Sequence, residues 1–402
     1  MKWVKNDENQ RVPIKSWCET VEQGALDQAM NLACHPAVEG WVALMPDCHV
    51  GYGMPIGGVI AVKNAILPSA VGVDIGCGMI AVRTNVEAER LAEIPLRRAI
   101  QNKLKERVPV GEGVHHKEAQ QWEGFERYLD VNGQVSDFAN ALDRHNLGTL
   151  GGGNHFAELQ KSDEGMVWLM IHSGSRNLGQ RVEKYYQELA KKLDEAFHVA
   201  LPDPNLAFLP METQEGRDYF RDMTFALEYA LENRHHMMAA FKETLAEFIP
   251  NVEFMEEINI HHNYAALESH GDRNYYIHRK GATSAKEGEI GIIPGSMGTA
   301  SYIVRGLGNP QSFNSCSHGA GRCMSRAAAS ERLTVEECDN AMTGIVYERW
   351  NKFRRFGKKQ DKDFYDLSEA PQAYKPIDDV IAAESDLVEP LVRLTPLSVL
   401  KG

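Results

Sequence analysis

Apolar residues recur at helical spacing in four parts of the chain. Near the N-terminus, Thr20-Val21-Glu22-Gln23 resembles a capping box, and apolar positions then follow at Val21, Ala25, Ala29 and Leu32. Similar spacing predicts further helices over about residues 87–107, 178–199 and 213–249. Residues 111–140 are polar and lack a clear period, so we expect a flexible loop region there.

Short apolar runs between these segments predict β-strands. The runs cover residues 41–45, 154–159, 166–171, 258–264, 275–281 and 290–298. Most of them meet a glycine turn or a histidine, and the glycine loop at 315–326 is expected to enter a further helix. No internal repeat or low-complexity linker divides the sequence, so residues 1–402 are expected to form one large α+β domain.

The composition is that of an ordinary globular protein. Of the 402 residues, 43% are hydrophobic and 25% are charged, which is sufficient for a large core. No apolar run approaches the length needed to span a bilayer, and the first residues contain no apolar signal-peptide core. The seven cysteines are scattered without a paired framework, which indicates reduced thiols and predicts a cytoplasmic protein.

The formal net charge of −13 argues against a protein that coats nucleic acid generally. It does not exclude an enzyme that acts on nucleic acid, because a local basic cleft can exist on an acidic protein. The fifteen histidines are a rich supply of ligands and bases. Their positions along the chain are more informative than their number.

The first candidate site is the glycine-rich segment 71–79, which interrupts apolar, strand-like sequence. Its glycines allow a tight turn, and it places Asp74 three residues before Cys77. A carboxylate and a thiol inside apolar sequence need a cation to offset their desolvation. A buried free cysteine beside a turn-forming aspartate explains this segment equally well, so residues elsewhere must decide.

Single histidines at the ends of apolar runs favour the metal interpretation. His155 follows the glycine turn at 148–153, and His172 ends the run at 166–171. Of the pair His261–His262, only one side chain can face a given site, because adjacent residues of a strand point to opposite faces. These positions supply enough ligands for two cations that share one thiolate. The five metal-type side chains are Asp74, Cys77, His155, His172 and His262.

His318 stands apart from this group, in a glycine loop that also contains Arg322 and Arg326. Gly319 and Gly321 free the backbone for contact with an anion at the start of the following helix. His318 is suited to be a sixth metal ligand, a general base or a nucleophile toward phosphorus, and spacing does not choose among these. The residues themselves therefore indicate a phosphate-handling, binuclear metalloenzyme.

A set of motifs in chain order resembles the RtcB RNA-splicing ligase family, and the match spans nearly the whole chain. The motifs are residues 45–51, 73–78, 153–156, 172–176, 262–263, 294–298, 317–322 and 401–402. The resemblance implies the family's own α+β fold, a single domain of mixed β-sheets flanked by helices. It also implies a ligase that joins RNA 3′-phosphate or 2′,3′-cyclic phosphate ends to 5′-hydroxyl ends, in RNA repair or tRNA splicing. GTP and two manganese ions per chain are the implied cofactors.

The resemblance assigns roles to individual residues. His318 matches the histidine that becomes covalently guanylylated, and the five metal-type side chains match the metal ligands. The implied RNA-phosphate contacts are His49, Arg176, Lys280, Arg322 and Arg326. The implied guanylate site consists of Asn154, His155, Phe156, Ala157, Glu158, His262, Asn263, Pro294, Gly295, Ser296, Met297, Ser301, His318, Gly319, Ala320, Gly321 and Lys401. Asp47 and Cys48 lie inside a motif, and we expect them only to surround the site. Ligand softness by itself favours zinc at a Cys/His site, so manganese follows from the resemblance alone.

Two other functions remain as alternatives at this point. One is a member of the same family that guanylylates or trims nucleic-acid ends without efficient sealing, and nothing in the sequence excludes it. The other is a metal-dependent RNA-binding protein that has lost catalysis, which the intact His318 and five ligands argue against. The natural RNA, the need for an activating protein partner and the oligomeric state stay open.

Overall fold

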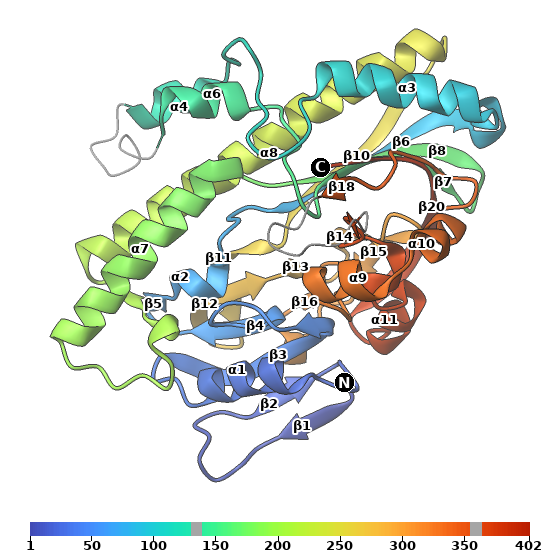
Figure 1. Ribbon diagram of the computed structural model, residues 1–402. Helices are drawn as coiled ribbons and strands as arrows, with labels where there is room; N and C mark the ends of the chain where they lie inside the picture. The colour runs from blue at the N-terminus through green and yellow to red at the C-terminus, as the bar shows by residue number, and fades with distance from the viewer. Residues whose placement is uncertain (130–138, 354–363) are drawn as a thin grey trace, which may run out of the picture.

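Two large β-sheets form the centre of the protein in a computed structural model, which describes residues 1–129, 139–353 and 364–402 (Figure 1). The six-stranded sheet has the order β1 (Trp3–Lys5), β2 (Ile14–Ser16), β3 (Val38–His49), β4 (Ile56–Val62), β12 (Arg273–Lys280) and β11 (Asn263–His270). The eight-stranded sheet has the order β10 (Phe254–His261), β6 (Gly78–Glu87), β8 (Met166–Ser173), β7 (Phe156–Ser162), β20 (Val388–Lys401), β15 (Ser301–Gly306) and β14 (Ile290–Ile293), with β17 (Val346–Tyr347) paired to β20.

The remaining strands form two-stranded ladders. They are β13 (Ala282–Ser284) with β16 (Ser315–Ser317), β5 (Ala65–Ile66) with β9 (Leu209–Pro210), and β18 (Lys352–Phe353) with β19 (Phe364–Tyr365). The α-helices are α1 (Gln23–Ala33), α2 (Pro68–Val71), α3 (Ile94–Arg107), α4 (Glu123–Leu129), α6 (Ala141–Asn146), α7 (Arg176–Ala196), α8 (Gln214–Phe248), α9 (Arg326–Arg332), α10 (Val335–Ala341) and α11 (Ile377–Ala383).

Strand alternation in β6 explains how the eight-stranded sheet buries both of its faces. Ile80 and Val82 point to one face, where they pack with side chains of α3 and α8. Met79 and Ala81 point to the other face, into a second cluster that includes Ile292 from β14. The edge strands β10 and β14 also contact each other, so the sheet curls around this second cluster.

The six-stranded sheet is covered in the same way by elements from both ends of the chain. Ala25 and Leu32 of α1 pack with Leu44 on one face of β3. Ala43 and the neighbouring strand β4 face a different cluster, which contains residues from β16 and α11. The long helices α7 and α8 pack against each other along one side of the molecule (Figure 1).

The fold confirms the predicted α+β class with mixed sheets and flanking helices. The helices predicted at about 178–199 and 213–249 are α7 and α8. The assignment of residues 1–402 to one ligase domain stays a prediction. Within the described residues, no helix is both long enough and apolar enough to cross a membrane.

Several predicted boundaries were wrong. The helix predicted from about residue 87 begins at Ile94, with a proline in its first turn, because β6 continues to Glu87 and a short 3-10 helix (Ala88–Leu91) follows. α1 begins at Gln23 after Glu22, without the side-chain cap expected from Thr20. Residues 111–129 include α4, and residues 130–138 of the predicted loop lie outside the described residues.

Two strand predictions also need correction. The run at 258–264 is two strands, since β10 ends at His261 and β11 begins at Asn263 in the other large sheet. The strand predicted at 41–45 extends from Val38 to His49. Asp47 and His49 therefore belong to a strand that runs into the region between the sheets.

Candidate active site

Antiparallel pairing brings the predicted metal ligands to one end of the eight-stranded sheet. β6 begins where β8 ends, since Gly78 pairs with Ser173, and β7 begins there too, since Phe156 pairs with His172. β10 ends beside the start of β6, where His261 pairs with Gly78. Four predicted ligands therefore lie close together at this end of the sheet. They are Cys77 directly before β6, His172 near the end of β8, His155 directly before β7 and His262 directly after β10.

The side chains of these residues form two groups that share Cys77. Cys77 with His172 and His262 makes one group, and Asp74 with Cys77 and His155 makes the other. In each group the ligand atoms lie within 4.8 Å of one another. Cys77 Sγ lies 3.2 Å from His172 Nε2 and 3.6 Å from His155 Nε2, and His155 Nε2 lies 3.2 Å from Asp74 Oδ2. The structure thus brings the side chains of all five predicted ligands together, in two groups that have Cys77 in common.

Backbone carbonyls orient two of the histidine rings toward this centre. His155 Nδ1 is 3.0 Å from the Leu150 carbonyl oxygen, and His172 Nδ1 is 3.2 Å from that of Asn154. Donation from Nδ1 leaves Nε2 of each ring as the ligand atom, as in other histidine metal sites. Gly174 is required beside them, because a Cβ at that position would overlap the carboxylate of Asp74.

The electrostatics of the group are compatible with metal binding. Burial lowers the pKa of His172 and of His262 well below the usual value, so both rings are neutral and can donate an electron pair. Burial, together with the charge of Asp74, raises the pKa of the Cys77 thiol. A bound cation would reverse this effect and favour the thiolate. The residues present fit one or two transition-metal ions.

His318 lies beside this centre, directly after β16. Its ring centroid is 4.9 Å from that of His262. Its Nδ1 is 2.6 Å from Asp47 Oδ2, and its backbone N–H donates to the same oxygen at 3.1 Å. Burial would raise the pKa of Asp47, but the charge and hydrogen bond of His318 lower it, so the carboxylate is ionised. This hydrogen bond engages Nδ1 and leaves Nε2, on the opposite side of the ring, available for chemistry.

Asp47 is therefore a positioning residue for His318 that the sequence did not identify as such. It is fully buried in β3. Gly321, with φ +71°, lets the loop after His318 approach Asp47 so closely that a Cβ there would overlap the Asp47 backbone. A carboxylate shortly after the apolar run 41–45 was the available signal, but its partner lies 271 residues away in the sequence.

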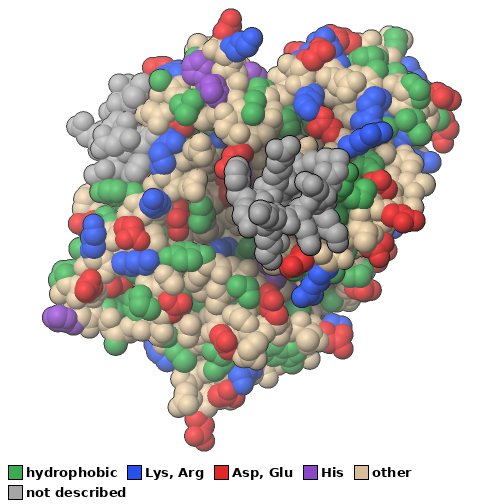
Figure 2. Space-filling model, in the orientation of Figure 1, with side chains coloured by type: hydrophobic (Ala, Val, Ile, Leu, Met, Phe, Trp, Pro, Cys, Tyr) green, Lys and Arg blue, Asp and Glu red, His purple; other side chains and the backbone are tan. Residues whose placement is uncertain are grey.

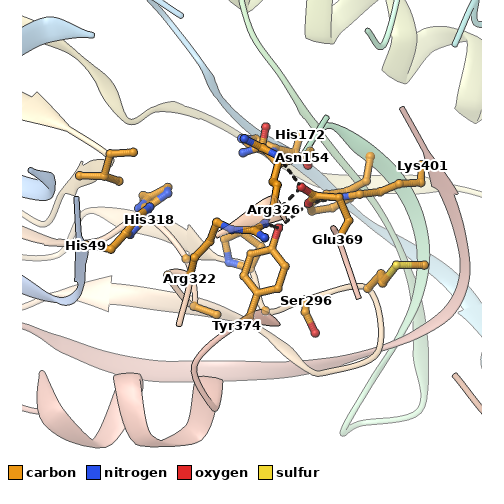
Figure 3. Close-up of a pocket in the computed structure, with 18 residues that line it drawn as sticks. His49, Asn154, His172, Ser296, His318, Arg322, Arg326, Glu369, Tyr374 and Lys401 are labelled. Carbon is orange, nitrogen blue, oxygen red and sulfur yellow. Dashed lines mark hydrogen bonds and ion pairs between the residues drawn. The ribbon is translucent and has the colours of Figure 1, made fainter. Parts of the chain in front are cut away.

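A cavity of about 150 Å³ extends from His318 and His172, and Figure 3 shows the residues that line it. Many of the predicted guanylate-site residues line this cavity: Asn154, Phe156, Pro294, Gly295, Ser296, Met297, His318, Gly319, Ala320, Gly321 and Lys401. Two others, Ser301 and Asn263, contact neighbouring residues of the site without lining the cavity. Ser301 Oγ accepts from the Gly295 backbone N–H at 3.2 Å, and Asn263 Nδ2 donates to the Asp74 carbonyl oxygen at 3.1 Å.

The remaining predicted guanylate residues lie in the adjoining sheet and metal centre. Ala157 and Glu158 are buried in β7, where both pair with β20. Burial raises the pKa of Glu158 to about 8, and Gln160 Nε2 donates to its carboxylate at 2.5 Å. His155 and His262 belong to the metal-type groups described above.

The predicted RNA contacts occupy different environments. His49, Arg322 and Arg326 line the cavity. Arg176 lies next to the metal-type group, with Nη1 3.4 Å from His155 Nδ1. Lys280 is buried outside the cavity, where its Nζ donates to the Tyr52 and Ser69 carbonyl oxygens at 2.5 and 2.9 Å. Burial lowers the pKa of Lys280 to about 7.

The charge around this site is mixed. Figure 2 shows acidic and basic side chains interspersed over the described part of one face of the protein. The cavity, in contrast, brings Arg322, Arg326 and Lys401 together. Three residues that line the cavity were missed in the sequence, and one of them is the apolar Ile56. The other two are Glu369, which pairs with all three cations, and Tyr374, whose hydroxyl hydrogen-bonds to Glu369 (Figure 3).

Comparison with known proteins places the chain in one family. A family model described as tRNA-splicing ligase RtcB matches residues 28–402. The chain belongs to the RtcB family. It is 40% identical to the RNA-splicing ligase RtcB of Escherichia coli K12, over 98% of each chain. It is also 31% identical to the tRNA-splicing ligases RtcB of Methanococcus maripaludis, over 96% of this chain and 92% of the relative, and Thermococcus kodakarensis, over 99% and 96%. The predicted resemblance to RtcB is thereby confirmed.

Proposed function

We propose that this protein is a GTP-dependent RNA ligase that joins 3′-phosphate or 2′,3′-cyclic phosphate ends to 5′-hydroxyl ends. The observation that carries this proposal is the position of His318, held by Asp47 at one nitrogen and placed beside five metal-type side chains. The relatives named as RNA-splicing and tRNA-splicing ligases support the reaction class.

In the first step, His318 Nε2 attacks the α-phosphorus of GTP. A nitrogen–phosphorus bond forms, the bond from the α-phosphorus to the bridging oxygen breaks, and pyrophosphate leaves. The lone pair on an imidazole nitrogen is the nucleophile that this attack requires. Asp47 accepts the Nδ1 hydrogen bond and stabilises the positive charge that the ring acquires.

In the second step, an oxygen of the RNA 3′-phosphate attacks the same phosphorus and releases His318. The product is an RNA strand with a diphosphoguanosine 3′ end. The 5′-hydroxyl of the other strand then attacks the terminal RNA phosphorus, a phosphodiester forms and GMP leaves. A 2′,3′-cyclic end must first be hydrolysed to the 3′-phosphate. His49, Arg322 and Arg326 are proposed to hold RNA phosphates during these steps.

The proposal includes two manganese ions, held by Asp74, Cys77, His155, His172 and His262. Such ions would neutralise phosphate oxygens around the reacting phosphorus. The thiolate and imidazole ligands by themselves favour zinc, so the identity of the ion needs a separate test.

All seven cysteines, each in the described part of the chain, are free thiols, which supports the proposed cytoplasmic location.

Incubation with α-labelled GTP and manganese, followed by RNA with 3′-phosphate and 5′-hydroxyl ends, tests the function. We expect labelled protein first, and unlabelled joined RNA after the strands are added. Label that accumulates on RNA ends without joining would favour the alternative, a guanylylating enzyme without efficient sealing. Protein that never becomes labelled would contradict the proposal.

Asp47→Asn is expected to slow guanylylation of His318 by roughly 10²- to 10⁴-fold, because the imidazole loses the carboxylate that orients it and balances its charge. The measurement is the single-turnover rate of protein labelling by α-labelled GTP. Metal content should not change, since Asp47 contacts none of the five ligands. Asp378→Asn is the matched control, because Asp378 is an exposed carboxylate that accepts from Tyr302. A labelling rate within threefold of the unaltered protein would remove Asp47 from this role.

Lys401→Met is expected to raise the GTP concentration for half-maximal guanylylation by about tenfold, equivalent to about 1.4 kcal/mol. The ammonium group of Lys401 lines the cavity and lies 5.6 Å from the centroid of the Phe156 ring. Methionine keeps an unbranched side chain of nearly the same length and removes the charge together with the N–H donors. Deleting Lys401 and Gly402 together should have at least the same effect. An unchanged dependence on GTP in both variants would exclude Lys401 from the nucleotide site.

A further inference from the structure

One carboxylate occupies the centre of the basic part of the cavity. Glu369 lies 3.2 Å from Arg322 Nη1, 3.1 Å from Arg326 Nε and 3.2 Å from Lys401 Nζ. It also accepts from the hydroxyl of Tyr374. Figure 3 shows Glu369 between these side chains, with His318 and His49 at the opposite side of the cavity.

The groups around Glu369 come from separate parts of the chain. Arg322 belongs to the loop after His318, Arg326 begins α9, Lys401 ends β20, and Glu369 itself precedes the short 3-10 helix Pro371–Ala373. Arg322 is also anchored by the Ser368 and Met324 carbonyl oxygens, at 2.6 and 3.0 Å. Arg326, in contrast, has a side chain that is 57% exposed. Arg326 is therefore free to move onto another anion without unpacking the core.

The contacts to Glu369 are those that a phosphate group would make. Guanidinium and ammonium groups donate to carboxylate and phosphate oxygens with similar geometry. Three cations and one carboxylate leave a net charge of +2 in this cluster. Burial opposes ionisation of Glu369, but the nearby cations and Tyr374 lower its pKa to about 2, so the carboxylate persists at neutral pH.

We propose that Glu369 occupies the place of a substrate phosphate in the substrate-free protein, and that the 3′-phosphate of the RNA displaces it from Arg326. That the competing anion is an RNA phosphate rests on the proposed function. That Glu369 competes with an external anion follows from its contacts with the three cations. An internal anion lowers the apparent affinity for every external one. It also keeps the cations in position, so only an anion that binds them better than a carboxylate gains the site.

A purely structural role for Glu369 makes the opposite prediction. If the carboxylate only held the loop, α9 and β20 together, its loss would disorder the three cations and weaken anion binding. If it competes with phosphate, its loss strengthens binding. The direction of the change therefore separates the two roles.

The experiment measures binding of a short fluorescent RNA by anisotropy without GTP, comparing a 3′-phosphate strand with the same strand ending in a 3′-hydroxyl. Glu369→Gln should bind the 3′-phosphate strand about five- to tenfold more tightly than the unaltered protein, with a smaller gain for the 3′-hydroxyl strand. Glu389→Gln removes the same charge from an exposed pair with Arg305 and should change neither affinity. Tyr374→Phe, which removes one hydrogen bond to Glu369, should give a smaller gain in the same direction.

Unchanged or weaker binding of the 3′-phosphate strand by Glu369→Gln would overturn the inference while leaving the proposed ligase function intact. If Glu369→Gln does not fold, as judged by thermal unfolding, the result with Tyr374→Phe decides between the two roles. Failure of the unaltered protein and both variants to distinguish the two strands would contradict the proposed function, and the inference with it.

Discussion

Cys77→Ala is expected to eliminate metal binding at the paired site and to reduce guanylylation and joining by more than about 10²-fold, while the protein stays folded. Cys77 is the ligand common to both groups, so its loss leaves each with two members. Even the removal of a partner that only orients a ligand costs 10- to 100-fold in metal affinity or activity, and a methyl group offers the cations no electron pair. The measurement is metal content per chain after dialysis against manganese, together with labelling by α-labelled GTP.

Cys338→Ala is the matched control for this experiment. Cys338 is also a buried free thiol, but it packs in a small apolar cluster with Leu367 and Ala370. Both substitutions remove one buried sulfur, so any general cost in stability should appear in the two thermal unfolding curves alike. Two manganese ions per chain in Cys77→Ala would show that the thiolate does not bridge the cations.

Elements of the fold could be predicted where the sequence pattern lies within a single helix or strand, and not where it depends on pairing between distant segments. α7 and α8 were found because a long helix repeats its apolar spacing many times. The start of α3 was misplaced because residues 87–91 look helical in composition, although Glu87 ends β6 and Ala88–Leu91 form a 3-10 helix. The break between β10 and β11 was missed because pairing with two different sheets leaves no mark in a continuous run such as 258–264.

The same distinction explains which site residues were found. The five metal-type side chains have unusual chemistry at strand ends, and that is visible in the sequence before any pairing is known. Asp47 was placed only in the surroundings, because its role depends on the distant His318. Glu369 has no motif of its own, and its importance comes from three cations that only the folded chain brings together. Lys280 is the opposite case. It was predicted to contact RNA, but in the fold its ammonium group donates to carbonyl oxygens inside the protein.

His318→Ala is expected to abolish labelling of the protein by α-labelled GTP and joining of 3′-phosphate RNA, a loss of more than about 10³-fold for removal of a nucleophile. The same variant should still join RNA that already carries a 3′-diphosphoguanosine end to a 5′-hydroxyl strand. This follows because, in the proposed reaction, His318 forms bonds in guanylylation and in transfer to RNA but has no covalent part in sealing. The measurement is gel analysis of both reactions in parallel with the unaltered protein.

The alternative role of His318 as a sixth metal ligand predicts the loss of every step together with a loss of metal, since its ring lies only 4.9 Å from that of His262. Metal content of His318→Ala therefore has to be measured in the same preparation. Normal metal content with sealing of pre-activated RNA would assign His318 to guanylyl transfer alone, because the five ligands remain to support phosphoryl transfer. Normal metal content without any sealing would mean that the imidazole also acts in the last step, as an acid, a base or a contact to the leaving GMP. Label on a residue other than His318 in the unaltered protein would refute the assignment itself.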